Sequence, residues 1–372
     1  MSKFKLGNRS ELDGIRGLSV LAVMAWHAEI RFCRGGKLGV DVFFVLSGFL
    51  ITALLLQEWN KNGNIDLKNF YIRRALRLFP VLFVMMLLYG IYASLYETPV
   101  QALNSYKYIA ATLFYVANWV QVVLGLHHPV LGHTWSLAVE EQFYILYPLL
   151  LIRFLRTKAN HRWLLLYFST VIAGVVLNRF WIWQGTASYD RAHMSLDTRA
   201  DALLIGCFVA VLVVNGLVPK KRWIFDLIRI LSICSFFILC RVISRGIDEE
   251  IYYKYGGATI VAGCVGIVIL DLMGRPSKPM QWFLQIPPLV WVGRLSYGLY
   301  LWHIPVFVLV GANVTLSETQ LKITSFVAVL LVAAGSFYAI ERPFLKLKDK
   351  YVSSGRRPFK VEVNPKIQET PA

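Results

Sequence analysis

The segment "LDGIRGLSVLAVMAWHAEI", residues 12–30, is apolar enough to enter a lipid bilayer, yet it contains two ionisable side chains, Arg16 and His27. An ionisable side chain in hydrocarbon costs at least about 2–3 kcal/mol on insertion scales, so it usually faces a partner, a water-filled cavity or a reacting group. Eleven residues at about 100° each bring Arg16 and His27 to one face of a helix, about 16 Å apart. This face is predicted to point into protein and away from lipid.

The composition of the whole chain is that of an integral membrane protein. Of its 372 residues, 56% are hydrophobic and only 16% are charged, which is typical of a polytopic membrane protein. The net charge is +17, but the basic residues lie between apolar segments and do not cluster with aromatic or polar groups, so no nucleic acid partner is expected. The five cysteines are scattered and lack the spacing of metal ligands, so no metal site is expected.

Apolar runs long enough to cross a bilayer recur along the chain. The eleven candidates lie near 14–31, 39–57, 78–96, 108–124, 135–152, 163–181, 201–218, 223–243, 256–273, 288–310 and 321–340. If all of them crossed from a cytosolic N-terminus, most of the loop lysines and arginines would lie outside, against the positive-inside rule. If the 108–124 segment returns without crossing, about three-quarters of them lie inside.

We therefore expect an all-α membrane protein, a bundle of about ten transmembrane helices with both termini in the cytosol. One re-entrant or interfacial segment is expected around Tyr108 to Leu124, where Asn118, Trp119 and Gln121 are unsuited to lipid. Residues 1–345 are expected to form the membrane domain. Residues 346–372 are polar and contain proline, so they are expected to form a disordered cytosolic tail.

Three arginines precede the third apolar run, in "FYIRRALRLFP". Arg73 and Arg77 are four residues apart and Arg74 and Arg77 are three apart, so a helical turn presents them as one cationic face at the cytosolic surface. One interpretation is an anchor that pairs with the phosphates of membrane lipids. The other is a clamp for the phosphates of a ligand, because guanidinium groups bind phosphate with two parallel hydrogen bonds.

Two adjacent carboxylates, Glu140 and Glu141, lie in the apolar segment "HTWSLAVEEQFYILYPLL". They cannot both face lipid, so one is expected at an interface or cavity and one against a cationic partner. His27 and Arg16 are the nearest candidates by chemistry. A structural ion pair between helices is the alternative interpretation.

Other polar residues stand in apolar surroundings further along. Asp41 lies in "GVDVFFVLSGFLIT", and Ser296, Tyr297 and His303 lie in "GRLSYGLYLWHIP". A lone histidine such as His303 is more often structural than catalytic, and the tyrosine and tryptophan content of this segment is also typical of an interfacial aromatic belt.

Together these segments resemble the acyltransferase 3 family of polytopic membrane O-acyltransferases, which includes O-antigen and exopolysaccharide acetylases. Arg16 and His27 match the family's pattern of arginine, ten residues and histidine. Further blocks match in the same order, from Leu12 to about Phe344. They are "GVDVFFVLSGFLI", "RRALRLFP", "WSLAVEEQFYILYP", "RADALLIG", "SYGLYLWHIP" and "ERPF".

The resemblance implies an acyl-CoA donor that is reached from the cytosol, with no other cofactor, and a carbohydrate hydroxyl acceptor that is free or lipid-linked. It also implies an essential histidine at His27 and a location in the bacterial inner (cytoplasmic) membrane. Some relatives carry a C-terminal extracytoplasmic domain that completes the transfer. Only about thirty residues follow Glu341, so we expect that the membrane domain acylates its acceptor directly or that a separate extracytoplasmic partner completes the reaction.

The expected catalytic residues are His27, Glu141 and Arg16. A neutral imidazole is suited to remove the proton of an attacking alcohol, and Glu141 is expected to orient it, as the carboxylate does in a Ser-His-Asp arrangement. His27 as a nucleophile that forms an acyl-imidazole is the alternative. Arg16, together with the three arginines at 73, 74 and 77, is expected to hold the CoA phosphates.

The expected substrate-binding residues also include Asp41, Ser296 and Tyr297, the last two as lining of the acceptor or thioester pocket. The competing function is a transporter of lipid-linked sugars or acyl groups that performs no chemistry. Transporters commonly contain repeated halves with broken helices at matching places, and no such repeat is visible here. Turnover of the thioester distinguishes the two classes.

Overall fold

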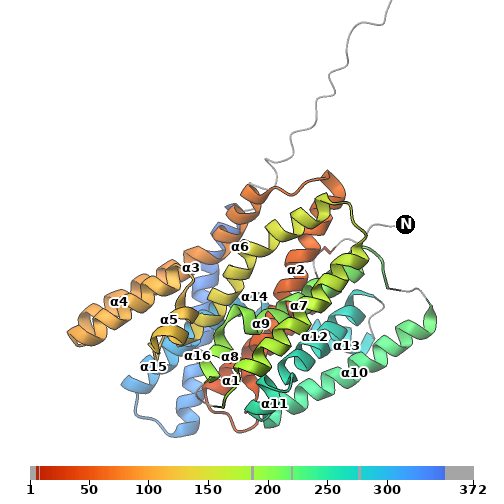
Figure 1. Ribbon diagram of the computed structural model, residues 1–372. Coiled ribbons are helices and arrows are strands. Elements are labelled where there is room, and N and C mark those ends of the chain that lie inside the picture. Colours follow the sequence, from red (N-terminus) through yellow and green to blue (C-terminus); the bar gives the residue numbers. More distant parts are fainter. Residues whose placement is uncertain (1–5, 8, 186–187, 219–220, 275–277, 348–372) are drawn as a thin grey trace, which may run out of the picture.

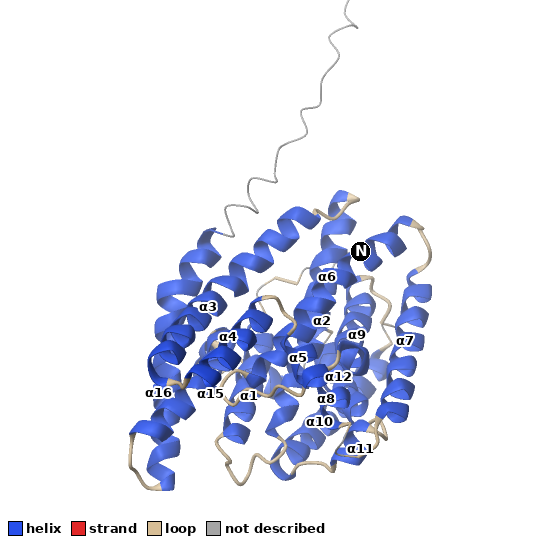
Figure 2. Ribbon diagram, turned by 60° about the vertical axis from the view of Figure 1, so that its left-hand side comes forward, coloured by secondary structure: helices blue, strands red, loops and turns tan. Residues whose placement is uncertain are grey.

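The computed structural model describes residues 6–7, 9–185, 188–218, 221–274 and 278–347, and its regular elements in these ranges are helices (Figures 1 and 2). The helices are α1 (Ser10–His27), η1 (Gly36–Leu38), α2 (Gly39–Asn62), α3 (Leu67–Tyr96), α4 (Pro99–Leu113), α5 (Ala117–Leu124), η2 (Gly132–Thr134), α6 (Trp135–Arg156), α7 (His161–Ile182), α8 (Tyr189–Met194), α9 (Leu196–Val214), α10 (Arg222–Arg245), α11 (Glu249–Tyr253), α12 (Gly257–Met273), α13 (Lys278–Leu284), α14 (Pro287–Arg294), α15 (Ser296–Asn313), α16 (Glu318–Ser336) and η3 (Phe337–Glu341). The predicted tail at 346–372 lies almost entirely outside the described residues.

Five of these helical segments are long and apolar enough to cross a membrane: Gly36–Asn62, Leu67–Tyr96, His161–Ile182, Arg222–Arg245 and Glu318–Leu347. The number is seven if the bent pairs α12–α13 and α14–α15 each count as one span. The protein is thus an all-helical integral membrane protein, but the described helices do not reach the predicted number of about ten spans by length and composition. Charged residues explain part of the difference, because α1, α6 and α9 each carry acidic and basic side chains that lower their hydropathy.

The 108–124 segment is not one helix. It contains the end of α4 and the whole of α5, with Tyr115 between them at a positive φ of 55°. The eight residues of α5 span only about 12 Å, too short for a hydrocarbon core of about 30 Å. α5 packs against α6 and α8. Its re-entrant or interfacial position stays a prediction.

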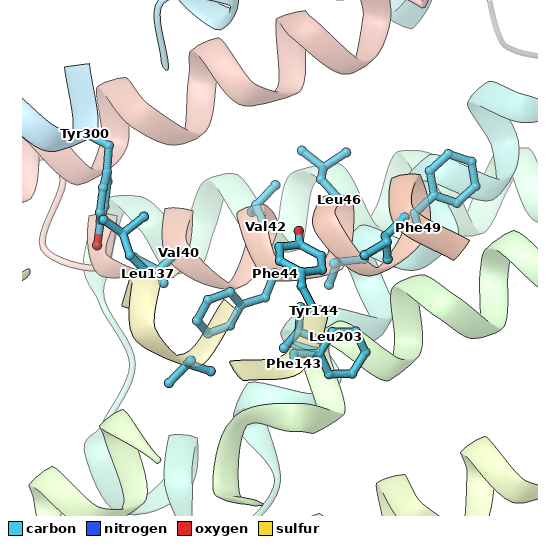
Figure 3. Packing of buried hydrophobic residues seen from close by; sticks show 14 of the residues in the cluster. Val40, Val42, Phe44, Leu46, Phe49, Leu137, Phe143, Tyr144, Leu203 and Tyr300 are labelled. Atoms are coloured by element: carbon cyan, nitrogen blue, oxygen red, sulfur yellow. The ribbon is translucent and has the colours of Figure 1, made fainter. Parts of the chain in front are cut away.

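α2 lies at the centre of the bundle and packs along α9. Glycines allow this close approach, because a Cβ on Gly48 would lie 1.9 Å from the carbonyl oxygen of Leu203, and one on Gly206 would lie 2.0 Å from that of Val45. Small residues at such crossings let helix backbones meet in membrane proteins. Figure 3 shows Phe44 and other α2 side chains packed with residues of α6 and α9 around this crossing.

A second close crossing joins α1 to α14. A Cβ on Gly17 would lie 2.5 Å from the carbonyl oxygen of Leu289, and one on Gly293 would lie 1.8 Å from that of Asp13. α14 and α15 are bent by 72° relative to one another, and α15 also contacts α1. α1 is therefore held against both arms of this bent pair.

α16 ends in η3, a single π-helical turn at Phe337–Glu341. The turn places Glu341, which is 5% exposed, against α15, where a Cβ on Gly298 would lie 3.0 Å from Glu341 Oε1. Pro343 follows two residues later and has no N–H to donate to Ala339, so regular α-helical bonding is interrupted here. Single π-turns of this kind often occur at functional sites.

Candidate functional site

A cavity of about 620 Å³ lies between α2, α3, α6 and α15. Its lining residues on α2 extend from Val40 to Asn62, a distance of about 33 Å along a helix axis, so the cavity is long and narrow. Its volume falls within the range of about 300–1,000 Å³ that is usual for small-molecule sites. Near the end of α2 the lining is polar, with Glu58, Lys61 and Asp66.

All four predicted arginines line this cavity, Arg16 from α1 and Arg73, Arg74 and Arg77 from α3. Arg16 lies 3.7 Å from Asp13, and Arg73 lies 3.5 Å from Glu58. Arg77 forms no ion pair with any residue in the described ranges. The structure thus brings together cationic groups that are about sixty residues apart in sequence.

Arg74 is the most tightly held of the four. Its Nε donates to Glu141 Oε1 at 2.9 Å, its Nη2 lies 3.6 Å from Glu140 Oε1, and its guanidinium carbon lies 3.4 Å from the centre of the Tyr144 ring. Glu140 also accepts hydrogen bonds from Ser47 and, at 2.7 Å, from Tyr144. We call Arg74, Glu140, Glu141, Tyr144 and Ser47 the cavity charge cluster.

Glu141 therefore contacts Arg74, and the described hydrogen-bond partners of His27 are Val23 and His303. The predicted contact in which Glu141 orients His27 does not occur in the structure. The physical reason is that the Arg74 guanidinium on α3 faces this turn of α6 and gives Glu141 a charge-assisted hydrogen bond. The sequence spacing does not predict a contact between Arg74 and Glu141, which are 67 residues apart.

Ser296 and Tyr297 both line the cavity, and their role in an acceptor or thioester pocket stays a prediction. Ser296 is buried, and the Tyr297 hydroxyl donates to the carbonyl oxygen of Leu78 at 2.7 Å. This bond fixes the first turn of α15 to α3. Further along α15, Tyr300 also lines the cavity, with its hydroxyl 2.6 Å from Ser136 Oγ.

Asp41 does not line the cavity. It is 1% exposed, forms an ion pair with Arg199 and accepts a hydrogen bond from Tyr252. Close by, Arg179 lies 3.0 Å from Asp201. We call these five residues the closed charge cluster. Arg199 supplies the counter-charge that a buried carboxylate requires, and the substrate contact of Asp41 stays a prediction.

His27 is the last residue of α1 and meets a second histidine, His303 of α15. Its Nδ1 lies 3.1 Å from the carbonyl oxygen of Val23 and 3.2 Å from His303 Nε2. His303 is completely buried, and its Nδ1 lies 2.6 Å from the carbonyl oxygen of Tyr300. A third histidine, His133, has its ring centre 5.1 Å from the ring centre of His303.

The cavity and the histidines are joined through Tyr300. Its ring centre lies 5.5 Å from that of His303 and 5.5 Å from that of His133, and its hydroxyl donates to the His133 carbonyl at 3.0 Å. His27 itself is not among the lining residues. From the sequence alone, His303 in the segment "SYGLYLWHIP" was more readily interpreted as structural than as catalytic.

Comparisons with known proteins identify the family of the chain. The model of an acyltransferase domain, that of the acyltransferase 3 family, matches residues 9–341. The chain belongs to the acyltransferase 3 family. It carries an acyltransferase domain, and every site residue discussed above lies inside the matched range. No solved structure matches the chain.

Three relatives illustrate the similarity. The peptidoglycan O-acetyltransferase OatA of Listeria monocytogenes is 34% identical over 90% of this chain and 55% of its own length. A putative O-acetyltransferase of Staphylococcus aureus is 32% identical over 90% of this chain and 57% of its own length. The putative peptidoglycan O-acetyltransferase YrhL of Bacillus subtilis is 30% identical, over 89% and 54%. The chain thus spans about half the length of these relatives.

Proposed function

We propose that this protein transfers an acyl group, in the first instance acetyl, from acyl-CoA to a hydroxyl group of a cell-wall glycan. The observation that carries the proposal is the convergence of Arg16, Arg73 and Arg77 on a long cavity that also reaches Tyr300, the residue in contact with the histidines. The names of the relatives support acetyl as the acyl group and peptidoglycan as the acceptor.

The shape of the cavity suits a CoA thioester. Such a donor has phosphate groups at one end and the reactive thioester at the other, joined by a flexible arm. Guanidinium groups bind phosphate oxygens in pairs, and Arg77 has no ion-pair partner among the described residues, so it is available for this role. The thioester would then lie toward Ser136 and Tyr300.

The chemistry requires removal of a proton from the acceptor. As the hydroxyl oxygen attacks the thioester carbon, His27 takes its proton, the C–S bond breaks, and the proton passes to the departing CoA thiolate. The products are the ester and free CoA. The other route is an acyl-imidazole on His27, which would allow a separate extracytoplasmic protein to complete the transfer.

The test is turnover by His27→Ala and His27→Gln in the purified full chain, compared with wild type at equal amounts of folded protein. Acetyl-CoA and an oligosaccharide of N-acetylglucosamine are the probes, and release of the CoA thiol is the signal. We expect a loss of about 10²- to 10⁴-fold, the usual contribution of a general base. Near-normal rates in either variant contradict the role of His27.

Two further outcomes of this assay separate the alternatives. Mass analysis during turnover distinguishes the routes, because an acetyl-imidazole adds about 42 Da to the peptide that contains His27. A wild-type protein that binds acetyl-CoA but never cleaves it favours the transporter interpretation.

The proposal includes a position in the bacterial inner membrane with both termini in the cytosol. This orientation rests on the positive-inside rule, because with ten spans about three-quarters of the loop lysines and arginines lie on the cytosolic side. Reporter fusions after Lys158 and after Lys350 should both give a cytosolic signal. An extracytoplasmic signal at Lys158 would mean that the 108–124 segment crosses the membrane.

A further inference from the structure

The second histidine, His303, makes two contacts that together set the proton positions on His27. Its Nδ1 lies 2.6 Å from the carbonyl oxygen of Tyr300. A carbonyl oxygen only accepts hydrogen bonds, so this nitrogen must carry the proton. In a neutral imidazole the other nitrogen is then an acceptor, so His303 Nε2 presents a lone pair.

That lone pair faces His27 Nδ1 at 3.2 Å. For the contact to be a hydrogen bond, His27 Nδ1 must carry a proton. The carbonyl oxygen of Val23, 3.1 Å from the same nitrogen, imposes the same requirement, so the two acceptors share one N–H. The neutral form of His27 with its proton on Nδ1 therefore satisfies both contacts, and it leaves Nε2 without a proton.

We propose that His303 is a positioning residue that holds His27 in the tautomer whose Nε2 is the free base. This inference rests on the proposed function of His27. When Nε2 takes the proton of the acceptor hydroxyl, His27 becomes an imidazolium, and His303 Nε2 continues to accept from its Nδ1–H. The hydrogen bond from His27 Nδ1 to His303 Nε2 then becomes charge-assisted and stronger. This favours the transition state over the ground state.

The arrangement performs the task that a carboxylate performs in a Ser-His-Asp triad, but with a neutral acceptor. His303 is completely buried, and a neutral ring avoids the cost of a buried charge. Because His303 takes the place of a carboxylate beside His27, Glu141 is free to pair with Arg74. The side chain of His303 is itself fixed on α15 by Tyr300, whose hydroxyl contacts Ser136 at the cavity wall.

The experiment compares His303→Gln with His303→Met. The two side chains have similar length and volume, but only glutamine offers an oxygen that can accept from His27 Nδ1. We expect the methionine variant to lose about 10²-fold or more in kcat with little change in KM for acetyl-CoA, and the glutamine variant to recover at least part of this loss. His161→Gln, at the start of α7, is the control histidine.

The tautomer is read directly by ¹⁵N NMR of the full chain with labelled histidine, assigned with the His27→Gln variant. The wild type should show His27 with a protonated Nδ1 and an unprotonated Nε2. His303→Met should shift part of the population toward the other tautomer, because only the Val23 carbonyl then favours a proton on Nδ1. An unchanged spectrum in the methionine variant, or equal activity of the methionine and glutamine variants, overturns the role of His303. A wild type with the inferred tautomer and no thioester cleavage contradicts the proposed function and leaves the positioning contact intact.

Discussion

Two groups of charged side chains lie within this helical bundle, one buried and one partly buried, and they differ in what lies beside them. The closed charge cluster pairs Asp41 with Arg199 and Arg179 with Asp201, and all four side chains are at most 2% exposed. In the cavity charge cluster, the ion-paired side chains of Arg74, Glu140 and Glu141 are 13–19% exposed. The same residue types thus serve two different purposes.

The closed cluster satisfies most of its polar groups within the protein. Arg179 donates to the carbonyls of Tyr253 and Thr198 as well as to Asp201 and Thr259. It joins α7, α9 and the start of α12, so its role is to fix helices. The cavity cluster, by contrast, lies beside arginines that have room to bind a ligand. The lesson is that a charge inside the bundle becomes a candidate for function when a cavity adjoins it.

The largest expected effect is on stability in the closed cluster. Asp41→Leu leaves Arg199 buried without its counter-charge, which typically costs about 3–5 kcal/mol. We expect a large fall in the thermal unfolding temperature of the detergent-solubilised protein. The double variant Asp41→Leu/Arg199→Met should recover much of the loss, because it removes both charges. A single variant as stable as wild type would show that the closed cluster is not what fixes these helices.

A smaller effect, on substrate binding, is expected in the cavity. Arg77→Gln should raise the KM for acetyl-CoA about tenfold, equal to about 1.4 kcal/mol, with kcat and unfolding temperature nearly unchanged, because it removes a contact made equally in ground and transition states. Arg153→Gln, an exposed arginine on α6, is the matched control. If Arg77→Gln leaves KM as unchanged as the control does, Arg77 returns to the interpretation of a lipid anchor.

The smallest effect is expected for an ion pair outside both clusters. Arg191 and Asp197 lie 2.5 Å apart with side chains 31% and 47% exposed. Water screens such pairs, so Asp197→Ala should cost less than about 1 kcal/mol and leave acetyl-CoA turnover unaltered. A loss of stability as large as that of Asp41→Leu would mean that the exposure of an ion pair does not determine how much it stabilises this protein.

The sequence predicted the helical class because apolar runs of membrane length are visible without any tertiary information. The run at 223–243, for example, corresponds closely to α10. The sequence did not predict that the run at 288–310 is bent by 72° between α14 and α15. A bend of this size depends on packing against α1, where Gly293 meets the backbone of Asp13.

The site was predictable where a motif marks it and not where partners come from distant positions. Arg16, Arg77 and Tyr297 were singled out from their motifs, and the structure brings them to one cavity. Asp41, however, pairs with Arg199, 158 residues away, and sequence order carries no signal for such a contact. His303 was missed for the same reason, because its role is defined by His27, 276 residues earlier.

The π-helical turn at the end of α16 bears on how the length of this chain can change. The turn at Phe337–Glu341 contains one residue more than an α-helical turn does, so losing one residue there restores an ordinary helix while the flanking turns keep their orientation. Anywhere else in α16, a one-residue deletion rotates all that follows by about 100° and moves the face that α16 packs on α15. Deletion of a single residue should therefore be accepted at this turn, at the expense of the inward position of Glu341.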